Sequence, residues 1–420
     1  MKKKILLISY YFSPNNVIGA IRPTKIAERL SETGHHVDVF TYGYTNNDGY
    51  TTGQPAYTRY CMDDSEKLQK KNPNSWIFKR QSSIIQQLKK HIWTYNAHQK
   101  YRRFLKHFIH LYDTQLCKNN YDAVFTTFGP ICSLQAGLYV KKKNPHINWI
   151  CDFRDPAVGE WCPLLYKPLY FYYQEKACKL ADHIITVSDG YCRRICRGRY
   201  GDKAHMIPNG YDEKDKTGYE HHTLQDGKLH FTYVGALYLG ERDIGPVFKA
   251  IKELIEEGAV KKENIVFDYA GTEYPVLLSQ ANQYSMGDII INHNRLPRKE
   301  CLALQFSSHL LVLSTWNNKG EEGVFPGKFL EYMLIEKPIV ALVNGKLQNS
   351  EVKQVMTQGN LGVTYEAATE EEDFHALKEY IKMQYDSVTS TGNVKFSPNQ
   401  SILNRYNYDN IIQRIEDILA

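Results

Sequence analysis

The chain has 420 residues, a length that exceeds one ordinary hydrophobic core and fits two α/β domains of about 200 residues each. Hydrophobic residues make up 42% and charged residues 23% of the chain, which excludes a largely disordered protein. The net charge of +6 is too small to indicate nucleic-acid binding by itself. We therefore expect a two-domain globular protein with no nucleic-acid partner.

Metal-binding, disulfide and membrane-spanning functions are not indicated. The nine cysteines are odd in number and form no Cys-x-x-Cys pair, so we interpret them as reduced thiols and predict no metal site. The lysines at 2–4 precede an apolar run that ends at Ser9, which is too short for a signal peptide. No stretch approaches 18 consecutive apolar residues, and we expect a cytoplasmic chain.

The first half of the chain has the pattern of a parallel α/β domain. A short apolar strand at 5–8, a helix at about 22–33 and a second strand at 37–40 form a βαβ unit. Such units place ligands at the carboxyl ends of their strands. We predict an N-terminal Rossmann-like domain over residues 1–208, with further strands at 123–126, 149–153 and 184–187.

One segment of this domain, residues 76–119, is distinctive in composition. Aromatic and aliphatic side chains recur there at helical spacing, with lysines and arginines among them, which predicts a pair of basic amphipathic helices. Two interpretations stay open. The apolar stripe packs on the first sheet, or it lies on an anionic membrane surface, where each basic residue contributes about 1 kcal/mol. In the second case the chain is peripheral on the inner face of the plasma membrane.

A turn-rich, charged stretch at 209–228 separates this domain from a second one and is predicted to be a linker. The second domain, residues 229–398, again alternates short apolar strands with helices, which predicts another doubly wound sheet. The final residues, 399–420, carry apolar side chains at helical spacing and are predicted to form one closing helix. The strands are expected at 229–234, 265–269, 288–291, 310–313 and 338–343.

The strongest chemical signal lies just before a predicted helix in the second domain. Gly323 and Gly327 let the backbone approach a ligand closely, and a helix that starts after Pro326 offers free N–H groups with a positive dipole end. A diphosphate fits such a site. Lys328 adds a charge for a phosphate oxygen, and Glu331 lies one helical turn further on. The alternative is a surface helix with a solvated Glu331.

The first domain has its own candidate residues at strand ends. Gly19, in the first strand-to-helix loop, allows close approach to a phosphate or sugar, and Arg22 can neutralise charge there. A plain turn glycine is the alternative. Asp152 and Asp155 lie at the end of a later strand, which is the location expected for chemistry. A direct role in binding sugar or acceptor and a structural ion pair both remain open for them.

Several local motifs, weak singly and specific in this order, resemble the family-4 retaining glycosyltransferases of the GT-B fold. The likeness covers nearly the whole chain. It implies two facing Rossmann-like domains, an acceptor domain followed by a donor domain, with the closing helix packed back on the N-terminal domain. The motifs are Ser9–Pro14 with Gly19 and Arg22, Asp152–Pro156, Ala181–Ser188, Ile207–Asp212, Tyr233–Gly235 and Gly323–Pro338.

The resemblance also implies an activity and roles for single residues. It implies sugar transfer from a UDP- or GDP-linked nucleotide sugar, with retention of configuration and no other cofactor. Glu331 is similar to the glutamate that holds the donor ribose, and Leu296 to the position whose backbone reads the base. Arg242, in a Gly-x6-Arg spacing from Gly235, resembles the arginine that binds the diphosphate.

The sequence departs from the family pattern at two positions. Gly323 stands where the usual motif has a second glutamate, with Glu322 one place away, and Val247 stands where it has a lysine. We expect Lys328 to supply the missing positive charge. The sugar ligand lost at Gly323 is replaced either by Glu322 on a shifted loop or by backbone N–H groups.

No Asp-x-Asp motif follows a strand, so we expect a metal-independent reaction in which Arg242, Lys328 and the helix dipole stabilise the leaving nucleotide, with Asp155 as a further catalytic candidate. The resemblance implies a saccharide or lipid-linked oligosaccharide acceptor in bacterial capsule or exopolysaccharide synthesis. Two alternatives are an inactive scaffold that binds nucleotide sugars and a nucleotide-sugar epimerase. A nicotinamide dehydrogenase is disfavoured because no Gly-x-Gly-x-x-Gly follows a strand.

Overall fold

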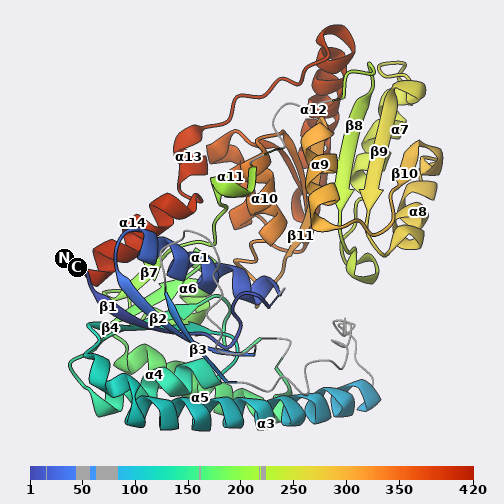
Figure 1. The fold of residues 1–420 in the computed structure, drawn as a ribbon. Helices are drawn as coiled ribbons and strands as arrows, with labels where there is room; N and C mark the ends of the chain where they lie inside the picture. The colour runs from blue at the N-terminus through green and yellow to red at the C-terminus, as the bar shows by residue number, and fades with distance from the viewer. Residues whose placement is uncertain (16, 44–56, 63–83, 160–161, 217, 219–223) are drawn as a thin grey trace. The chain divides into compact units, whose positions relative to one another are not determined.

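A computed structural model describes residues 1–15, 17–43, 57–62, 84–159, 162–216, 218 and 224–420. Within these residues the chain divides into two compact units. The first unit is Met1–Gly210 together with Tyr408–Ala420, and the second is Tyr211–Asn407. Each unit is built on one sheet of parallel strands, in agreement with the predicted α/β class (Figure 1). The predicted linker, 209–228, contains the first boundary, and its residues 217 and 219–223 lie outside the described residues.

The first unit has a seven-stranded sheet in the order β3-β2-β1-β4-β5-β6-β7. The order reverses between β1 and β4, which is where ligands bind in doubly wound sheets. Its strands are β1 (Lys4–Ile8), β2 (His36–Tyr42), β3 (Thr58–Met62), β4 (Ala123–Phe128), β5 (Asn148–Phe153), β6 (His183–Thr186) and β7 (Ala204–Met206). Its helices are α1 (Ile18–Glu32), α3 (Ile84–Thr114), α4 (Cys132–Lys143), α5 (Lys167–Leu180), α6 (Asp189–Cys196) and α14 (Tyr408–Leu419), with 3₁₀ turns η1 (Leu116–Asn119) and η2 (Leu164–Tyr166).

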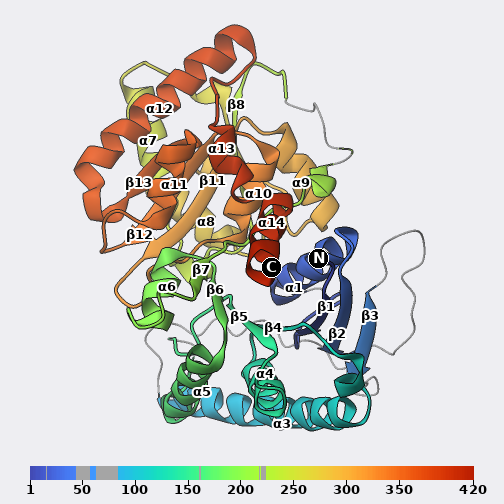
Figure 2. The ribbon, with the colours of Figure 1, turned by 90° about the vertical axis from the view of Figure 1, so that its left-hand side faces the viewer.

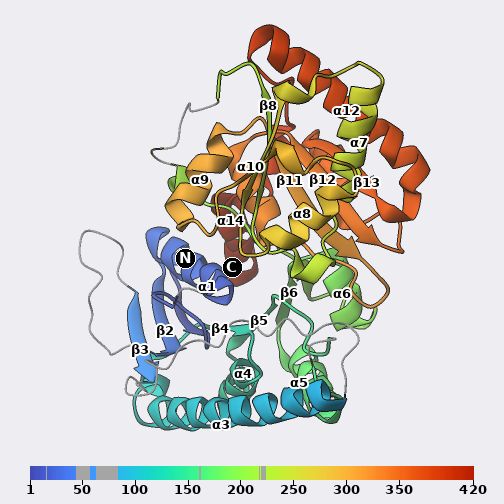
Figure 3. The ribbon, with the colours of Figure 1, turned by 90° about the vertical axis from the view of Figure 1, so that its right-hand side faces the viewer.

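Helices cover both faces of this sheet because successive strand side chains point to opposite faces and both sets are apolar. Alternate residues of β1, such as Ile5 and Leu7, pack with α1 and α14 on one face. The other set, such as Leu6 and Ile8, packs with α3, α4 and α5. Figures 2 and 3 show α3 crossing the outer side of α4 and α5. The C-terminal helix α14 thus belongs to the N-terminal unit.

Two helix predictions need correction. The segment 76–119 was predicted as a helix pair, but its described part, from residue 84 onward, is one helix of 31 residues, α3, followed by the short turn η1. The predicted single closing helix is two helices, α13 and α14, interrupted at residues 405–407. At this break the Tyr406 carbonyl accepts a hydrogen bond from the N–H of Tyr211, a residue outside the helix.

The second unit has a six-stranded sheet in the order β10-β9-β8-β11-β12-β13, which reverses between β8 and β11. Its strands are β8 (Leu229–Val234), β9 (Ile265–Ala270), β10 (Ile290–Asn292), β11 (Leu310–Asn317), β12 (Ile339–Gly345) and β13 (Gly362–Glu366). Its helices are α7 (Gly245–Glu256), α8 (Tyr274–Asn282), α9 (Arg298–Ser307), α10 (Gly327–Ile335), α11 (Glu351–Gly359), α12 (Glu370–Thr391) and α13 (Gln400–Asn404). Short 3₁₀ turns are η3 (Glu213–Lys216), η4 (Tyr238–Gly240), η5 (Lys262–Asn264), η6 (Gly287–Ile289) and η7 (Ala367–Thr369).

In this unit too, two cores lie on opposite faces of the sheet. Helices α7, α8 and α12 cover one face, where Phe231 and Tyr233 of β8 are buried. Helix α10 contributes to the other core, with Leu311 and Leu313 of β11. No helix in the described part of the chain is both long and apolar enough to span a bilayer.

Candidate functional site

The predicted residues of the second unit gather where its strand order reverses. Gly235 directly follows β8, and Arg242 lies on the loop from β8 to α7. The segment from Gly323 to Pro326 joins β11 to α10, and α10 carries Lys328 and Glu331. Because β8 and β11 are neighbouring parallel strands, their carboxyl ends lie side by side and bring these two loops together.

Lys328 is an enclosed cation whose Nζ has no hydrogen-bond partner among the described residues. Nζ lies 5.0 Å from the centre of the Tyr233 ring and directly against Gly235, where a Cβ atom would collide with it. Gly235 also has φ +119°, which side chains disfavour. Burial, followed by the charge of Arg242, lowers the pKa of Lys328 to about 7, against an opposing contribution from Glu331. An anion placed here would stabilise the charged form.

Arg242 is held by aromatic rings. Its Cζ lies 4.4 Å from the centre of the Tyr238 ring and 5.7 Å from that of Trp316. Nη1 donates a hydrogen bond of 3.3 Å to the Ala236 carbonyl, while the shielded Nε has no partner among the described residues. The guanidinium is therefore oriented by stacking and keeps a donor available.

A carboxylate that the sequence analysis did not single out, Glu273, organises the loop that carries Arg242. Its oxygens accept hydrogen bonds from the backbone N–H groups of Leu237, Tyr238 and Leu239, at 2.6, 3.1 and 2.8 Å. Tyr238 and Leu239 have φ of +53° and +57°, a conformation that costs free energy unless it is stabilised. Glu273 thus supports the conformation that places the Tyr238 ring under Arg242.

The same residue is linked to Gly235 through one tyrosine. The Glu273 N–H donates to the Tyr269 hydroxyl at 3.0 Å, and that hydroxyl donates to the Gly235 carbonyl at 3.1 Å. Glu273 follows β9, the strand beside β8, so its place at a carboxyl strand end was the available sequence signal.

The start of α10 is open to a ligand. Pro326 is its N-cap and provides no side-chain hydrogen bond, and no described atom outside the adjoining backbone lies within 4 Å of the place where a Cβ atom on Gly327 would stand. Gly323 has φ +82°, so a glutamate at this position would be strained. Glu322 accepts a hydrogen bond from the Gly320 N–H at 2.8 Å and stabilises its own loop. The backbone conformation thus explains why a glycine occupies position 323.

Glu331 is fixed from both sides by α9. Arg298 Nη1 donates to one carboxylate oxygen and Gln305 Nε2 to the other, each at 3.0 Å. The Glu331 side chain is 18% exposed. Leu296 lies half-buried just before α9, and its carbonyl accepts a weak hydrogen bond from the Cys301 thiol. Arg298 and Gln305 were not predicted, since nothing in the sequence pairs α9 with α10.

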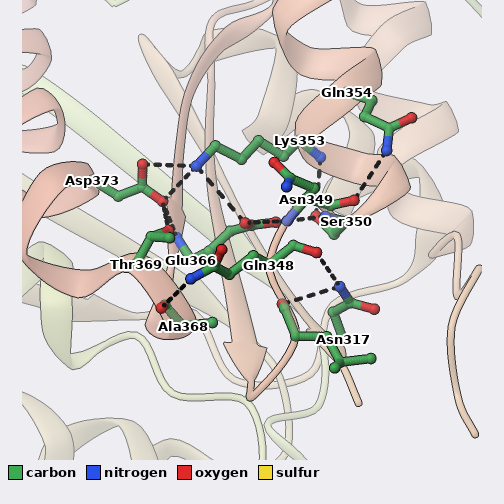
Figure 4. Close-up of polar contacts among 11 residues, drawn as sticks. Asn317, Gln348, Asn349, Ser350, Lys353, Gln354, Glu366, Ala368, Thr369 and Asp373 are labelled. Atoms are coloured by element: carbon green, nitrogen blue, oxygen red, sulfur yellow. Dashed lines mark hydrogen bonds and ion pairs between the residues drawn. The ribbon is translucent and has the colours of Figure 1, made fainter. Parts of the chain in front are cut away.

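A further buried network holds the neighbouring strand ends β12 and β13 (Figure 4). Glu366, fully buried, accepts hydrogen bonds from the N–H groups of Asn349 and Ser350 at the start of α11. Lys353 Nζ lies 2.8 Å from both oxygens of Asp373 and 3.7 Å from Glu366. The network keeps the loop after β12 rigid beside the site.

In the first unit, Arg22 and Asp152 form a buried ion pair rather than a ligand site. They are 2% and 0% exposed, and Arg22 donates to both oxygens of Asp152 at 2.9 to 3.1 Å. Arg22 also donates to the carbonyls of Ile207 and Pro208, and Thr127 donates to Asp152. This is the structural alternative left open by the sequence, with Arg22 as the cation. The pair joins α1 to β5 and to the segment after β7.

Gly19 has a structural reason to be small. A Cβ there would lie 2.8 Å from Nη1 of Arg154, which donates to the Gly19 carbonyl at 2.6 Å. Arg154 also donates to the Phe128 carbonyl at 3.2 Å. The close approach predicted at Gly19 is thus made by this guanidinium. Asp155, two residues after the end of β5, is accessible to solvent at its surface, but desolvation by the surrounding protein raises the pKa of its carboxyl group, against an opposing effect of the Arg154 charge.

Among the described residues, no group of three or more His, Cys, Asp or Glu side chains is placed to hold a metal ion. The structure therefore brings Gly235, Arg242, Lys328 and the start of α10 together in the second unit, with Glu331 beside them on α10. In the first unit it leaves Asp155 as the exposed candidate and commits Arg22 and Asp152 to each other.

Comparison with known proteins places these sites in context. Residues 24–215 match the family model described as Glycosyltransferase Family 4. The chain is similar to an *E. coli* structure described as trehalose-6-phosphate bound with UDP-2-fluoro glucose, with a TM-score of 0.61 and 12% identity over 99% of each chain. It is also similar to the apo lipopolysaccharide outer core galactosyltransferase WaaB, with a TM-score of 0.57 and 13% identity over 99% of each chain.

A third similar structure is an α,α-trehalose 6-phosphate synthase from Burkholderia multivorans, with a TM-score of 0.60 and 12% identity over 100% of this chain and 98% of that one. At such low identity these likenesses show the fold, which is GT-B, as predicted. No curated protein matches the sequence.

The buried ion pair yields a stability prediction. Asp152→Ala should lower the free energy of unfolding of the first unit by about 3–5 kcal/mol, because it leaves Arg22 buried without its counter-charge. Asp155→Ala, a matched change at an exposed neighbour, should change it by less than about 0.5 kcal/mol. Urea denaturation with hydrogen exchange read on β4 and β5 peptides measures both. Equal effects of the two variants would contradict the structural role of the pair.

A second prediction concerns the loop held by Glu273. Glu273→Gln removes the charge from three hydrogen bonds, each to a charged acceptor and worth about 1.5–3 kcal/mol. Amide exchange in the segment 237–239 should accelerate about tenfold or more, as measured by hydrogen–deuterium exchange mass spectrometry. Glu241→Gln, an exposed residue of the same loop, is the control and should leave exchange unchanged. If amide exchange in 237–239 is as slow in Glu273→Gln as in the wild type, the Glu273 charge is not needed to hold the loop.

Proposed function

We propose, from the premise that the chain is a family-4-like glycosyltransferase of the GT-B fold, that it moves a sugar from a nucleotide sugar bound in the second unit to a saccharide acceptor. The observation that carries the proposal is the enclosed, unpartnered Nζ of Lys328 between Tyr233, Gly235 and the open start of α10. A buried ammonium group that has no hydrogen-bond partner among the described residues, beside free helix N–H groups, suits an anionic ligand.

In this proposal the donor diphosphate lies between Lys328, Arg242 and the N-terminus of α10, against the backbone of Gly235. Glu331, held by Arg298 and Gln305, accepts hydrogen bonds from the ribose hydroxyls. The backbone near Leu296 contacts the base. Support for a UDP- or GDP-linked donor comes from the similar *E. coli* structure, whose description includes UDP-2-fluoro glucose.

The chemistry then follows from charge. As the bond between the sugar and the diphosphate breaks, its electron pair goes to the departing phosphate oxygen, and negative charge accumulates there. Lys328, Arg242 and the helix dipole stabilise that charge, at a few kcal/mol for each positioned donor, without a metal ion. We propose retention of configuration, with the departing phosphate as the group that accepts the acceptor hydroxyl proton. Asp155, exposed at the end of β5, orients acceptor hydroxyls.

For the acceptor we propose a lipid-linked saccharide of bacterial cell-surface polysaccharide synthesis, such as capsule or exopolysaccharide, at the inner face of the plasma membrane. Two observations support this. The N-terminal half of α3 exposes Leu88, Ile92, Trp93 and Tyr95 beside basic side chains. The similar galactosyltransferase WaaB is described as acting on the lipopolysaccharide outer core.

Calorimetry tests the donor site directly. In the presence of a metal chelator, UDP, GDP and their common sugar conjugates are titrated into the wild type and into Arg242→Ala, Lys328→Ala and Glu331→Gln. One nucleotide sugar should bind in the micromolar range, and each variant should lose about tenfold or more in affinity. Lys261→Ala, an exposed lysine of the same unit, is the matched control and should bind like the wild type.

The outcomes separate the alternatives. Transfer of the sugar to an acceptor supports the proposal, whereas an epimerised donor indicates a nucleotide-sugar epimerase. Binding without any turnover indicates an inactive scaffold. Equal binding by the three variants and the wild type would show that the donor site has been placed wrongly.

The pKa of Lys328 generates a pH prediction. Since this pKa is about 7 in the free chain, the lysine is charged below pH 7 and largely neutral above it. An anionic donor binds the charged form better, so affinity should be nearly constant below pH 7 and fall by up to about tenfold per unit above it. The measurement is calorimetry with a nucleotide sugar, whose diphosphate keeps a constant charge, between about pH 6 and 8.5. In Lys328→Ala the affinity should not change with pH. A wild-type affinity that does not change with pH would contradict the role of Lys328 in binding the donor.

A further inference from the structure

An apolar groove lies on the face of the first unit that is covered by α3, α4 and α5. Helices α3, α4 and α5 enclose a volume of about 650 Å³. This is within the range of about 300–1,000 Å³ that is usual for ligand sites. Its apolar lining comes from all three helices and consists of Leu105, Ile109, Leu138, Tyr139, Tyr173 and Leu180.

Lysines stand at the rim of the groove. Lys141, Lys142 and Lys176 all line it. Lys141 is neutralised by Asp182 at 2.7 Å. Lys142 and Lys176 are exposed and have no acidic partner in the described part of the chain, and Lys176 Nζ donates to the Tyr172 hydroxyl at 3.0 Å. The groove thus combines an apolar interior with two unneutralised cations at its mouth.

An exposed apolar stripe leads into the groove along η2 and α5. Leu165 lies in η2, and Leu169, Tyr172, Lys176 and Leu180 follow in α5 at intervals of three or four residues, which places these α5 residues on one helix face. The four apolar side chains are 78%, 40%, 53% and 42% exposed. Lys176 and Leu180 belong to both the stripe and the groove. Contiguous exposure of large apolar side chains marks an interaction surface.

The position of the groove excludes the saccharide acceptor as its occupant. Apart from Gln135 and Tyr173, the lining residues of α4 and α5 lie in the C-terminal halves of these helices, on the side from which the chain enters β5 and β6. They are therefore near the amino ends of the strands, whereas Asp155 and Arg154 lie at the carboxyl ends. A ligand of the groove would bind at a distance from the reacting sugar.

We propose that this groove seats one acyl chain of an anionic phospholipid, with the lipid phosphate between Lys142 and Lys176 and the α5 stripe in the membrane interface. This inference rests on the proposed function, which places the chain at a membrane surface, and it names the site at which the chain binds a lipid. Charge complementarity favours an anionic lipid, because each basic residue near such a surface contributes about 1 kcal/mol. The aliphatic and tyrosine side chains of the stripe suit the boundary between headgroups and acyl chains.

Vesicle flotation tests the surface. The full chain should bind phosphatidylcholine vesicles that contain phosphatidylglycerol and should not bind vesicles of phosphatidylcholine alone. Lys142→Glu/Lys176→Glu and Leu165→Ser/Leu169→Ser should each weaken binding by about tenfold or more. The controls carry the same changes on the second unit, at exposed residues, and should bind like the wild type: Lys261→Glu/Lys395→Glu and Leu224→Ser/Ile291→Ser.

Photo-crosslinking tests whether an acyl chain enters the groove. Phosphatidylglycerol with a diazirine in its acyl chain should label peptides that contain residues 105–109, 138–142 and 173–180. Vesicle binding without label on these peptides would overturn the seating of a chain. Failure to bind anionic vesicles by a preparation that still binds its nucleotide sugar would overturn the lipid site and leave the donor site standing. Equal loss in the control variants would also count against the site.

Discussion

The second unit depends on one unsatisfied charge, the ammonium group of Lys328. Within the described residues its Nζ has no hydrogen-bond partner: Tyr233 offers a ring face, and Gly235 offers space where any side chain would collide. Its pKa near 7, well below that of a solvated lysine, reflects the free-energy cost of burying the charged form. Other polar groups near Lys328 form hydrogen bonds within the protein. Glu273 binds the backbone of the loop that carries Arg242, and Arg298 of α9 binds Glu331. A site built in this way is preorganised, so that a ligand supplies the missing charge while the protein moves little.

The sequence predicted the elements whose pattern is local. The unbroken apolar run at 5–8 marks a central strand, and the repeated alternation of strands and helices predicts two doubly wound sheets, both of which the structure contains. It did not predict β3, β7 or β13, which lie at the sheet edges. β7, for example, has three half-buried residues and no apolar alternation. The fourth edge strand, β10, was predicted because the apolar residues at 289–291 are consecutive, so position at an edge does not by itself hide a strand.

Candidate residues were predictable by type and by position at strand ends, but their partners were not. Arg22 and Asp152 are 130 residues apart in the chain, and no spacing rule links them. The same limit applies to Glu273, whose partners are backbone amides that leave no sequence signature. Gly19 was predicted to allow the close approach of a phosphate or sugar, and the group that lies against it in the structure is the Arg154 guanidinium. The group that packs against a glycine is set by the tertiary structure and cannot be read from the local sequence.

The membership of α14 in the first unit has a consequence for biosynthesis. The chain leaves this unit at Gly210 and returns to it at Tyr408, after the whole second unit. While a ribosome is still translating that intervening stretch, α1 is the helix of this core that has already been made, and the apolar side chains that later contact Ile411 and Ile415 of α14 are not yet covered by them. A nascent N-terminal half therefore carries a partly uncovered apolar face until α14 emerges, a period in which chaperones have a binding surface. Translation order thus makes the final helix the closing step of folding for the domain that was synthesised first.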